Sequence, residues 1–168
     1  MKKVYRCSVI LAFAILGYAI VSCEKPTVFE DDDLINSLYQ MAKDTLAYES
    51  SYYILETELY RNLMPGGPVP KKSPLISILF LINIDSLDIS DKLVLDRLYV
   101  INDDLIYKSI PEYLDESNLP NYKQSYICRE GPEWETEINV DVVLELFSKS
   151  TDDRLYLIAR DQLIKKVW

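Results

Sequence analysis

The stretch Val140-Asp141-Val142-Val143-Leu144-Glu145-Leu146-Phe147 carries the clearest structural pattern in the chain. Val140, Val142, Leu144 and Leu146 fall on one face, and the two acidic residues fall on the other face with Val143 and Phe147. Alternation at period two predicts a β-strand with one face against a core. Residues 148–153 are polar and predict a turn. Leu155, Leu157 and Ala159 then predict the buried face of a returning strand, which is followed by residues 162–168.

A hairpin is predicted further upstream, around Asn102-Asp103, because these two residues tolerate the positive φ of a tight turn. Residues 93–101 and 104–110 would be its strands. A helix over residues 90–109 is the alternative, since Val94, Leu98, Ile101 and Leu105 also recur at helical spacing. The β-branched and tyrosine content of the stretch favours strands.

Residues 75–84 also alternate, and their even-numbered positions are all apolar, whereas Ser77 and Asn83 are odd-numbered. We therefore expect a strand whose even-numbered face is buried. Residues 111–132 contain three prolines and predict a long connection, with one helical turn at residues 111–116.

The N-terminal half has a different sequence pattern. Residues 64–74 hold half of the chain's prolines and half of its glycines, which predicts a linker without regular structure. Residues 34–63 contain neither, and their apolar and tyrosine residues recur three or four apart. This spacing predicts an amphipathic helix over residues 33–63, or a helical pair divided at Ser50-Ser51.

The chain opens with Lys2, Lys3 and Arg6, an apolar run over residues 7–21, and small Ser22, which is the order of an export signal. Ile20-Val21-Ser22-Cys23 resembles the lipobox of bacterial lipoproteins. The resemblance implies that residues 1–22 are a signal peptide and that Cys23 carries a diacylglyceryl group and becomes the N-terminus. Glu24 in the second mature position implies an outer-membrane destination. Residues 23–32 would form a tether, with Asp32 or Asp33 capping the helix.

A second resemblance covers residues 75–168. The stretches Leu95–Asp103, Arg129–Trp134 and Val140–Leu146 resemble a pattern of small uncharacterised bacterial lipoproteins, in which a Gly-Pro-x-Trp stretch precedes a Val-Asp-Val-Val strand of a β-sandwich-like domain. The resemblance supplies no activity. Together with the helix, it predicts an α+β protein: an N-terminal amphipathic helix or helical pair followed by an antiparallel β-sandwich-like domain over residues 75–168.

Composition narrows the range of functions that we expect. The formal charge is −9, and cleavage before Cys23 would remove three positive charges and bring it to about −12, which excludes nucleic acid as an expected partner. The chain has no histidine, so the Ser-His-Asp and Cys-His arrangements and the commonest zinc ligand are missing. We predict no cofactor, no metal site and no catalytic residue. Cys128 is expected to be a small buried hydrophobe.

The candidate binding residues are aromatic. Tyr48 and Tyr52 lie in the tyrosine-rich middle of the predicted helix, and Trp134 lies in the Gly-Pro stretch. Each could pack in a core or contact a protein or glycan. The expected function is a non-enzymatic binding or assembly module, lipid-anchored in the cell envelope at the outer membrane. The alternative is an acidic inhibitor or immunity-type lipoprotein that neutralises a basic partner protein.

Overall fold

The computed structural model describes residues 26–64, 73–116 and 118–168. This part of the chain is predominantly β, with one short α-helix. In chain order the elements are β1 (Thr27–Glu30), α1 (Asp32–Met41), β2 (Leu46–Tyr48), β3 (Ser51–Asn62), β4 (Ile76–Asn83), β5 (Leu93–Asn102), β6 (Leu105–Ser109), β7 (Glu112–Leu114), β8 (Lys123–Cys128), β9 (Asn139–Ser148) and β10 (Asp153–Val167).

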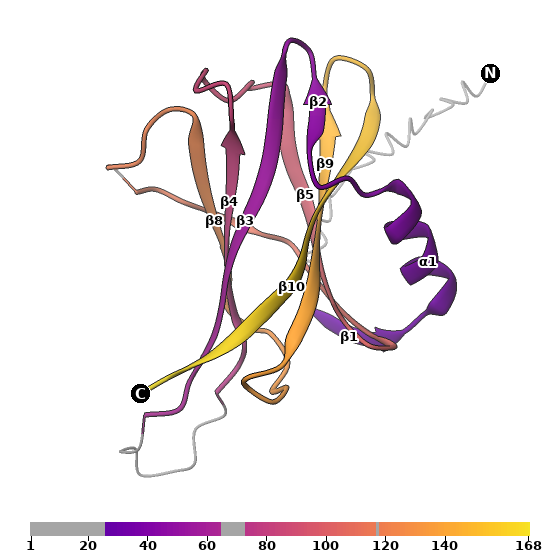
Figure 1. Ribbon diagram of the computed structural model, residues 1–168, viewed down its shortest axis with the longest axis vertical. Coiled ribbons are helices and arrows are strands. Elements are labelled where there is room, and N and C mark those ends of the chain that lie inside the picture. The colour runs from indigo at the N-terminus through magenta and orange to yellow at the C-terminus, as the bar shows by residue number, and fades with distance from the viewer. Residues whose placement is uncertain (1–25, 65–72, 117) are drawn as a thin grey trace, which may run out of the picture.

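The ten strands belong to one curled sheet, with the order β1-β6-β5-β9-β10-β3-β4-β8-β7 and with β2 paired to β3. The pairings are antiparallel except at β10, which runs parallel to β3 from Ile164 to Val167. The first part of β10 pairs with β9 instead, and the register shifts between Ala159 and Gln162. One 15-residue strand therefore joins the two halves of the sheet (Figure 1).

The main core lies between the two halves of the curled sheet. Val140, Val142, Leu144 and Leu146 of β9 all belong to it, which confirms the face predicted from their alternation. Leu157 and Ala159 of β10 lie in the same core, as predicted for the returning strand. The predicted hairpin is present as well, because β5 and β6 flank a turn in which Asp103 has a φ of 53°, although the turn is Asp103-Asp104, one residue later than predicted.

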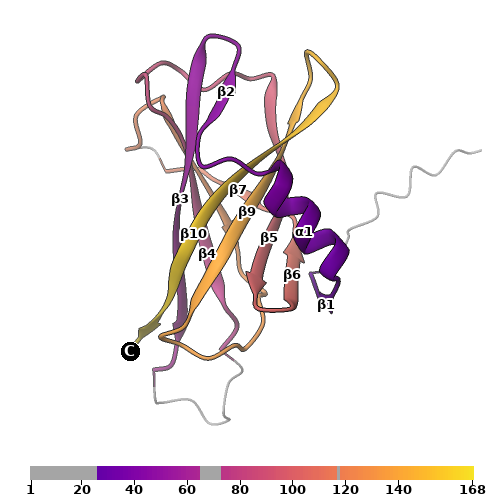
Figure 2. The same cartoon turned by 45° about the vertical axis from the view of Figure 1, so that its right-hand side comes forward.

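A second, smaller core lies between α1 and the outer side of the β5–β9–β10 region (Figure 2). Ile35 and Leu38 of α1 pack there against Val143 and Ile158. The helix begins where Asp31 Oδ1 accepts a hydrogen bond from the Leu34 amide at 2.9 Å, so the cap is Asp31 and not Asp32 or Asp33 as predicted. Asp32 and Asp33 occupy the first turn, where acidic side chains interact favourably with the positive end of the helix dipole.

The predicted α+β class is wrong, because the long helix over residues 33–63 does not form. Helix α1 has ten residues, and the chain then forms the hairpin of β2 and β3, whose turn contains Glu49 with a φ of 53°. Tyrosines and leucines are so dense in this stretch that they satisfy period two as well as helical spacing. The stretch forms a strand and not a helix because β3 pairs with β2, β4 and β10, and such tertiary contacts override a local preference.

Several other predicted segments also differ in the structure. Residues 27–30 of the predicted tether form β1, which pairs with β6. The expected connection over residues 111–132 contains β7 and β8, and residues 111–116 form no helical turn. Residues 65–72 of the predicted linker, the predicted signal peptide over residues 1–22 and Cys23 lie outside the described residues. Within those that are described, no helix is long and apolar enough to cross a membrane.

Candidate binding surface

The buried face of β4 is the opposite of the predicted one. Ser77, Leu79, Leu81 and Asn83 are fully buried, whereas the isoleucines and Phe80 at the even positions are only partly covered. The reason is that both faces of β4 are apolar, so the sequence pattern does not indicate which one meets the core. Two buried polar atoms on the inner face, Ser77 Oγ and Asn83 Nδ2, make no hydrogen bond to any described residue.

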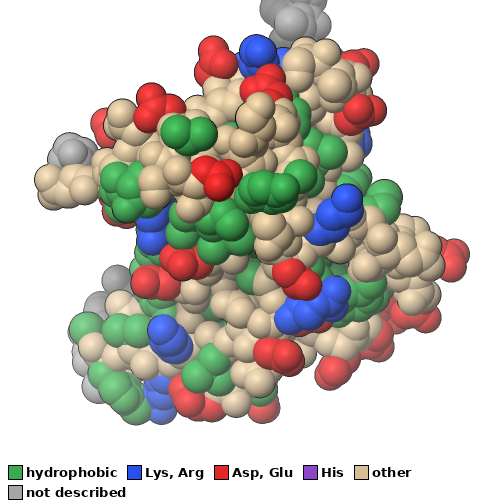
Figure 3. Space-filling model, turned by 45° about the horizontal axis from the view of Figure 1, so that its top comes forward, with side chains coloured by type: hydrophobic (Ala, Val, Ile, Leu, Met, Phe, Trp, Pro, Cys, Tyr) green, Lys and Arg blue, Asp and Glu red, His purple; other side chains and the backbone are tan. Residues whose placement is uncertain are grey.

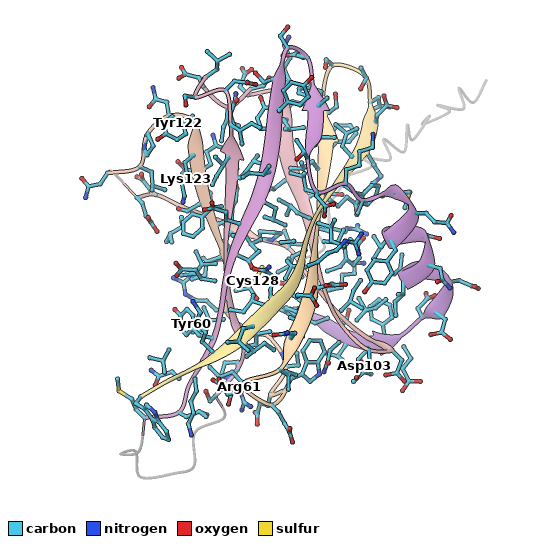
Figure 4. The ribbon with its side chains drawn as sticks, viewed as in Figure 1. Tyr60, Arg61, Asp103, Tyr122, Lys123 and Cys128 are labelled. Atoms are coloured by element: carbon cyan, nitrogen blue, oxygen red, sulfur yellow. The ribbon has the colours of Figure 1, made fainter. Side chains whose placement is uncertain are left out.

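The neighbouring strands extend this partly covered apolar face. Register across the sheet places Ile54 and Tyr60 of β3, and Ile127 of β8, on the same side as the even-numbered residues of β4. We call this surface the outer β3–β4–β8 face. It consists of Ile54, Glu56, Glu58, Tyr60, Ile76, Ile78, Phe80, Ile82, Lys123, Ser125 and Ile127, of which Ser125 and Ile127 are buried. Tyr60 and Lys123, labelled in Figure 4, lie on the side of the molecule away from α1.

One ion pair crosses the middle of the outer β3–β4–β8 face. Lys123 Nζ lies 3.2 Å from Glu56 Oε2 and 4.0 Å from the centroid of the Phe80 ring. A cation over an aromatic face is favourable, and the stem of the lysine covers part of the ring. The pair is accessible, since the Glu56 side chain is 55% exposed.

A shallow hollow of about 360 Å³ opens beside this pair, with Phe80, Glu56, Glu58 and Lys123 in its lining. It forms because β3 and β10 diverge here, before their parallel pairing begins at Ile164. Thr57 Oγ1 spans the gap and donates a hydrogen bond of 2.8 Å to Gln162 Oε1. The hollow is mixed in character, with one aromatic ring among charged and amide groups.

The outer face continues toward the end of the molecule that holds the β2–β3 turn. Tyr52 is 51% exposed and Ile84 is 49% exposed, and the Ile84 amide donates a 2.9 Å hydrogen bond to the Tyr52 carbonyl. In Figure 3, which brings this end forward, hydrophobic side chains lie between acidic ones. Tyr52 is thus the sequence-derived candidate that joins the outer face.

The other two aromatic candidates lie elsewhere. Tyr48 is buried at 7% exposure, and its hydroxyl lies 2.6 Å from Ser150 Oγ and accepts from Ser148 Oγ at 3.1 Å. Trp134 is half-buried and packs on the main core, near the far end of β3 from Tyr52. Its carbonyl accepts from Arg61, whose Nε also donates to the Ser73 carbonyl at 2.7 Å. The structure therefore does not bring Tyr48, Tyr52 and Trp134 together.

An ionic network around one buried carboxylate, that of Glu145, joins strands in the opposite half of the sheet. Glu145 is 2% exposed, accepts a 2.7 Å hydrogen bond from the Tyr99 hydroxyl and pairs with Arg154. Arg154 also pairs with Asp96 at 2.8 Å, so the network links β5, β9 and β10. Burial raises the pKa of Tyr99, which keeps its hydroxyl protonated as a donor. These groups satisfy one another, and the arrangement favours a structural role over acid–base chemistry.

The remaining reactive side chains are shielded. Burial raises the pKa of the Cys128 thiol to about 11, and the side chain is 3% exposed, as expected for a small buried hydrophobe. Within residues 26–64, 73–116 and 118–168, no three histidine, cysteine or acidic side chains are grouped so that they could hold a metal ion. The geometry of the outer β3–β4–β8 face favours a binding surface.

No protein-family model, curated protein or solved structure matches this chain. The surface is therefore interpreted from its own chemistry. Sequence reasoning missed most of it because the isoleucines of β4 were assigned to the core. The available signal was that the odd-numbered residues of the same strand include Leu79 and Leu81, which also require burial.

Proposed function

We propose that the protein is a lipid-anchored, non-enzymatic binding or assembly module of the bacterial outer membrane, and that it contacts a protein partner through the outer β3–β4–β8 face. The observation that carries the proposal is the apolar row of β4, whose side chains stay partly exposed although both faces of the strand are hydrophobic. Contiguous apolar surface rimmed by polar residues is typical of interaction sites.

The lipid anchor is the second part of the proposal and rests on the lipobox resemblance at Cys23. Acylation would place the folded part close to the bilayer, because β1 begins at Thr27. Four residues span at most about 14 Å. The anchor is tested by feeding cells an alkyne fatty acid and following label and membrane fractionation. Cys23→Ser should abolish both the label and the membrane association, and retention of both would contradict the anchor.

The contact surface is tested separately by photo-crosslinking in intact cells. A benzoyl-phenylalanine replaces Tyr52 on the outer face or, as the control, exposed Asp104 in the β5–β6 turn. We expect discrete crosslinked products, identified by mass spectrometry, from the Tyr52 position only. Equal product patterns at both positions, or no product at either, would count against a binding role of this face.

A second candidate function follows from the charge of −9. An acidic inhibitor would attract a basic partner through long-range electrostatics, and its affinity would fall steeply with added salt. The affinity of binding through the apolar face would change much less with added salt. Titrating the identified partner at low and high ionic strength separates the two functions.

A further inference from the structure

We propose that the outer β3–β4–β8 face binds a second copy of this chain, as a two-fold symmetric dimer in which β3 of each copy lies over β8 of the other. The inference rests on the proposed function, since it names the partner of the same surface.

The charges on this face are divided between its two sides. On the β3 side, Glu56 and Glu58 are both exposed. On the β8 side, Lys123 belongs to the strand and Arg129 follows it directly, 3.8 Å from Glu112 of β7. The partly exposed apolar residues of β4 lie between the acidic and the basic side. A surface with this division is complementary to itself after one particular rotation.

That rotation is a half-turn about an axis that runs along β4 in the plane of the interface. It places the acidic β3 of one copy over the basic β8 of the other, twice in the same dimer, and brings β4 over its own copy. Packed sheets of this kind cross at about 30° and lie about 10 Å apart, which suits side chains of the size of isoleucine and phenylalanine. Each copy thus covers the apolar row of the other.

The size of the face sets the strength of the contact. Eight residues of β4 extend about 26 Å, and three strands are about 14 Å wide. Such a face measures about 360 Å² in projection, which is less than half of the roughly 800 Å² per partner that a specific interface of standard size buries. The net charge of −9 also opposes association at long range. We therefore expect a weak dimer in dilute solution, favoured where anchored copies share one membrane at a high effective concentration.

The axis makes a sharp prediction for thiol crosslinking of the full-length protein in detergent. Ile78 lies on β4, so a cysteine there would face its own copy across about 10 Å, which is too far for a direct disulfide. With a bismaleimide long enough to span this distance, Ile78→Cys should give at least tenfold more crosslinked dimer than Asp104→Cys or the parent chain, which also report any background from the native cysteines. Crosslinking of Ile78→Cys no greater than that of Asp104→Cys would overturn the proposed dimer.

A charge-exchange experiment tests the pairing of β3 with β8. Lys123→Glu places a carboxylate at both position 56 and position 123, and Glu56→Lys places an ammonium at both. Each variant alone should associate less than the parent, whereas a mixture should form heterodimers with two attractive seams. The intrachain pair between residues 56 and 123 is lost in both variants and stays lost in the mixture, so it cannot account for recovery.

The readout is co-purification of two differently tagged chains, with circular dichroism to confirm that both variants fold. We expect at least fivefold more co-purification from the mixture than from either variant with itself. No gain in the mixture would reject this arrangement. Photo-crosslinks from Tyr52 to a different protein, without any self-crosslink, would reject the dimer and leave the proposed function standing. Absence of both would reject both.

Discussion

The ammonium of Lys123 lies 4.0 Å from the centre of the Phe80 ring and reaches across it to Glu56. The contact joins β8, β4 and β3 on the surface that we propose as the binding face. Exposed ion pairs and cation–π contacts each contribute less than about 1 kcal/mol. Lys123→Met keeps most of the stem, so urea unfolding should show a loss below about 1 kcal/mol, which would leave the variant usable for binding studies. Lys43→Met, on an exposed lysine outside this face, is the matched control.

The network around Glu145 should matter much more for stability. Glu145 is the buried member of the network, whereas the Arg154 side chain is 51% exposed and keeps Asp96 as a partner. Loss of Glu145 leaves the buried Tyr99 hydroxyl without its acceptor, which typically costs about 1–3 kcal/mol. We expect Glu145→Ala to lower the free energy of unfolding by about that amount, measured by urea denaturation. Tyr99→Phe should cost less, and the double variant should show strong coupling, since the two side chains share one hydrogen bond of 2.7 Å. Additive effects would contradict the network.

The thiol of Cys128 should be inert in the folded protein. Its pKa is raised to about 11 by burial, so the thiolate that reacts with alkylating reagents is almost absent at pH 8. Iodoacetamide treatment at pH 8 followed by peptide mapping should leave Cys128 unmodified in the native protein and modify it fully in urea. Rapid native modification would show that the β8 region opens readily.

Alkaline pH should destabilise the fold through its buried tyrosines. Burial is the main cause that raises the pKa of Tyr39, Tyr107 and Tyr126 to about 12, from an ordinary value of 10.0. The folded state holds these protons more tightly than the unfolded state, so their contribution is complete below pH 10 and is lost as the pH rises from 10 to 12. Absorbance at 295 nm and circular dichroism should show late tyrosine ionisation accompanied by unfolding. Full ionisation near pH 10 with the fold intact would contradict this prediction.

The parts of the fold that could be predicted are those with one clear period. Strand β9 has an apolar residue at every even-numbered position from 140 to 146, and the β5–β6 hairpin turns at Asp103-Asp104, within one residue of the predicted place. The stretch that became β3 could not be assigned, because its tyrosines and leucines fit both periods and the choice depends on distant partners. Strand β8 was missed because six residues with mixed polarity carry little periodic signal.

The candidate surface was predictable only in part. Tyr52 was identified from the tyrosine content of its segment, and it does lie at one end of the outer β3–β4–β8 face. The rest depends on which side of β4 meets the core, and a strand that is apolar on both faces carries no local information about that. Only the pairing of β4 with β3 and β8 within a curled sheet settles it.

The parallel seam between β10 and β3 has a consequence for the rate of folding. The bridge from Thr57 to Gln162 joins residues 105 positions apart, and the seam itself lies just beyond it. Contacts of such long sequence separation form late, because the entropy of closing a large loop must be overcome before they can contribute. Refolding should therefore be slow for a chain of this size, on the scale of milliseconds to seconds. Until the seam forms, β3 and β10 would leave open edges at which two chains could pair incorrectly.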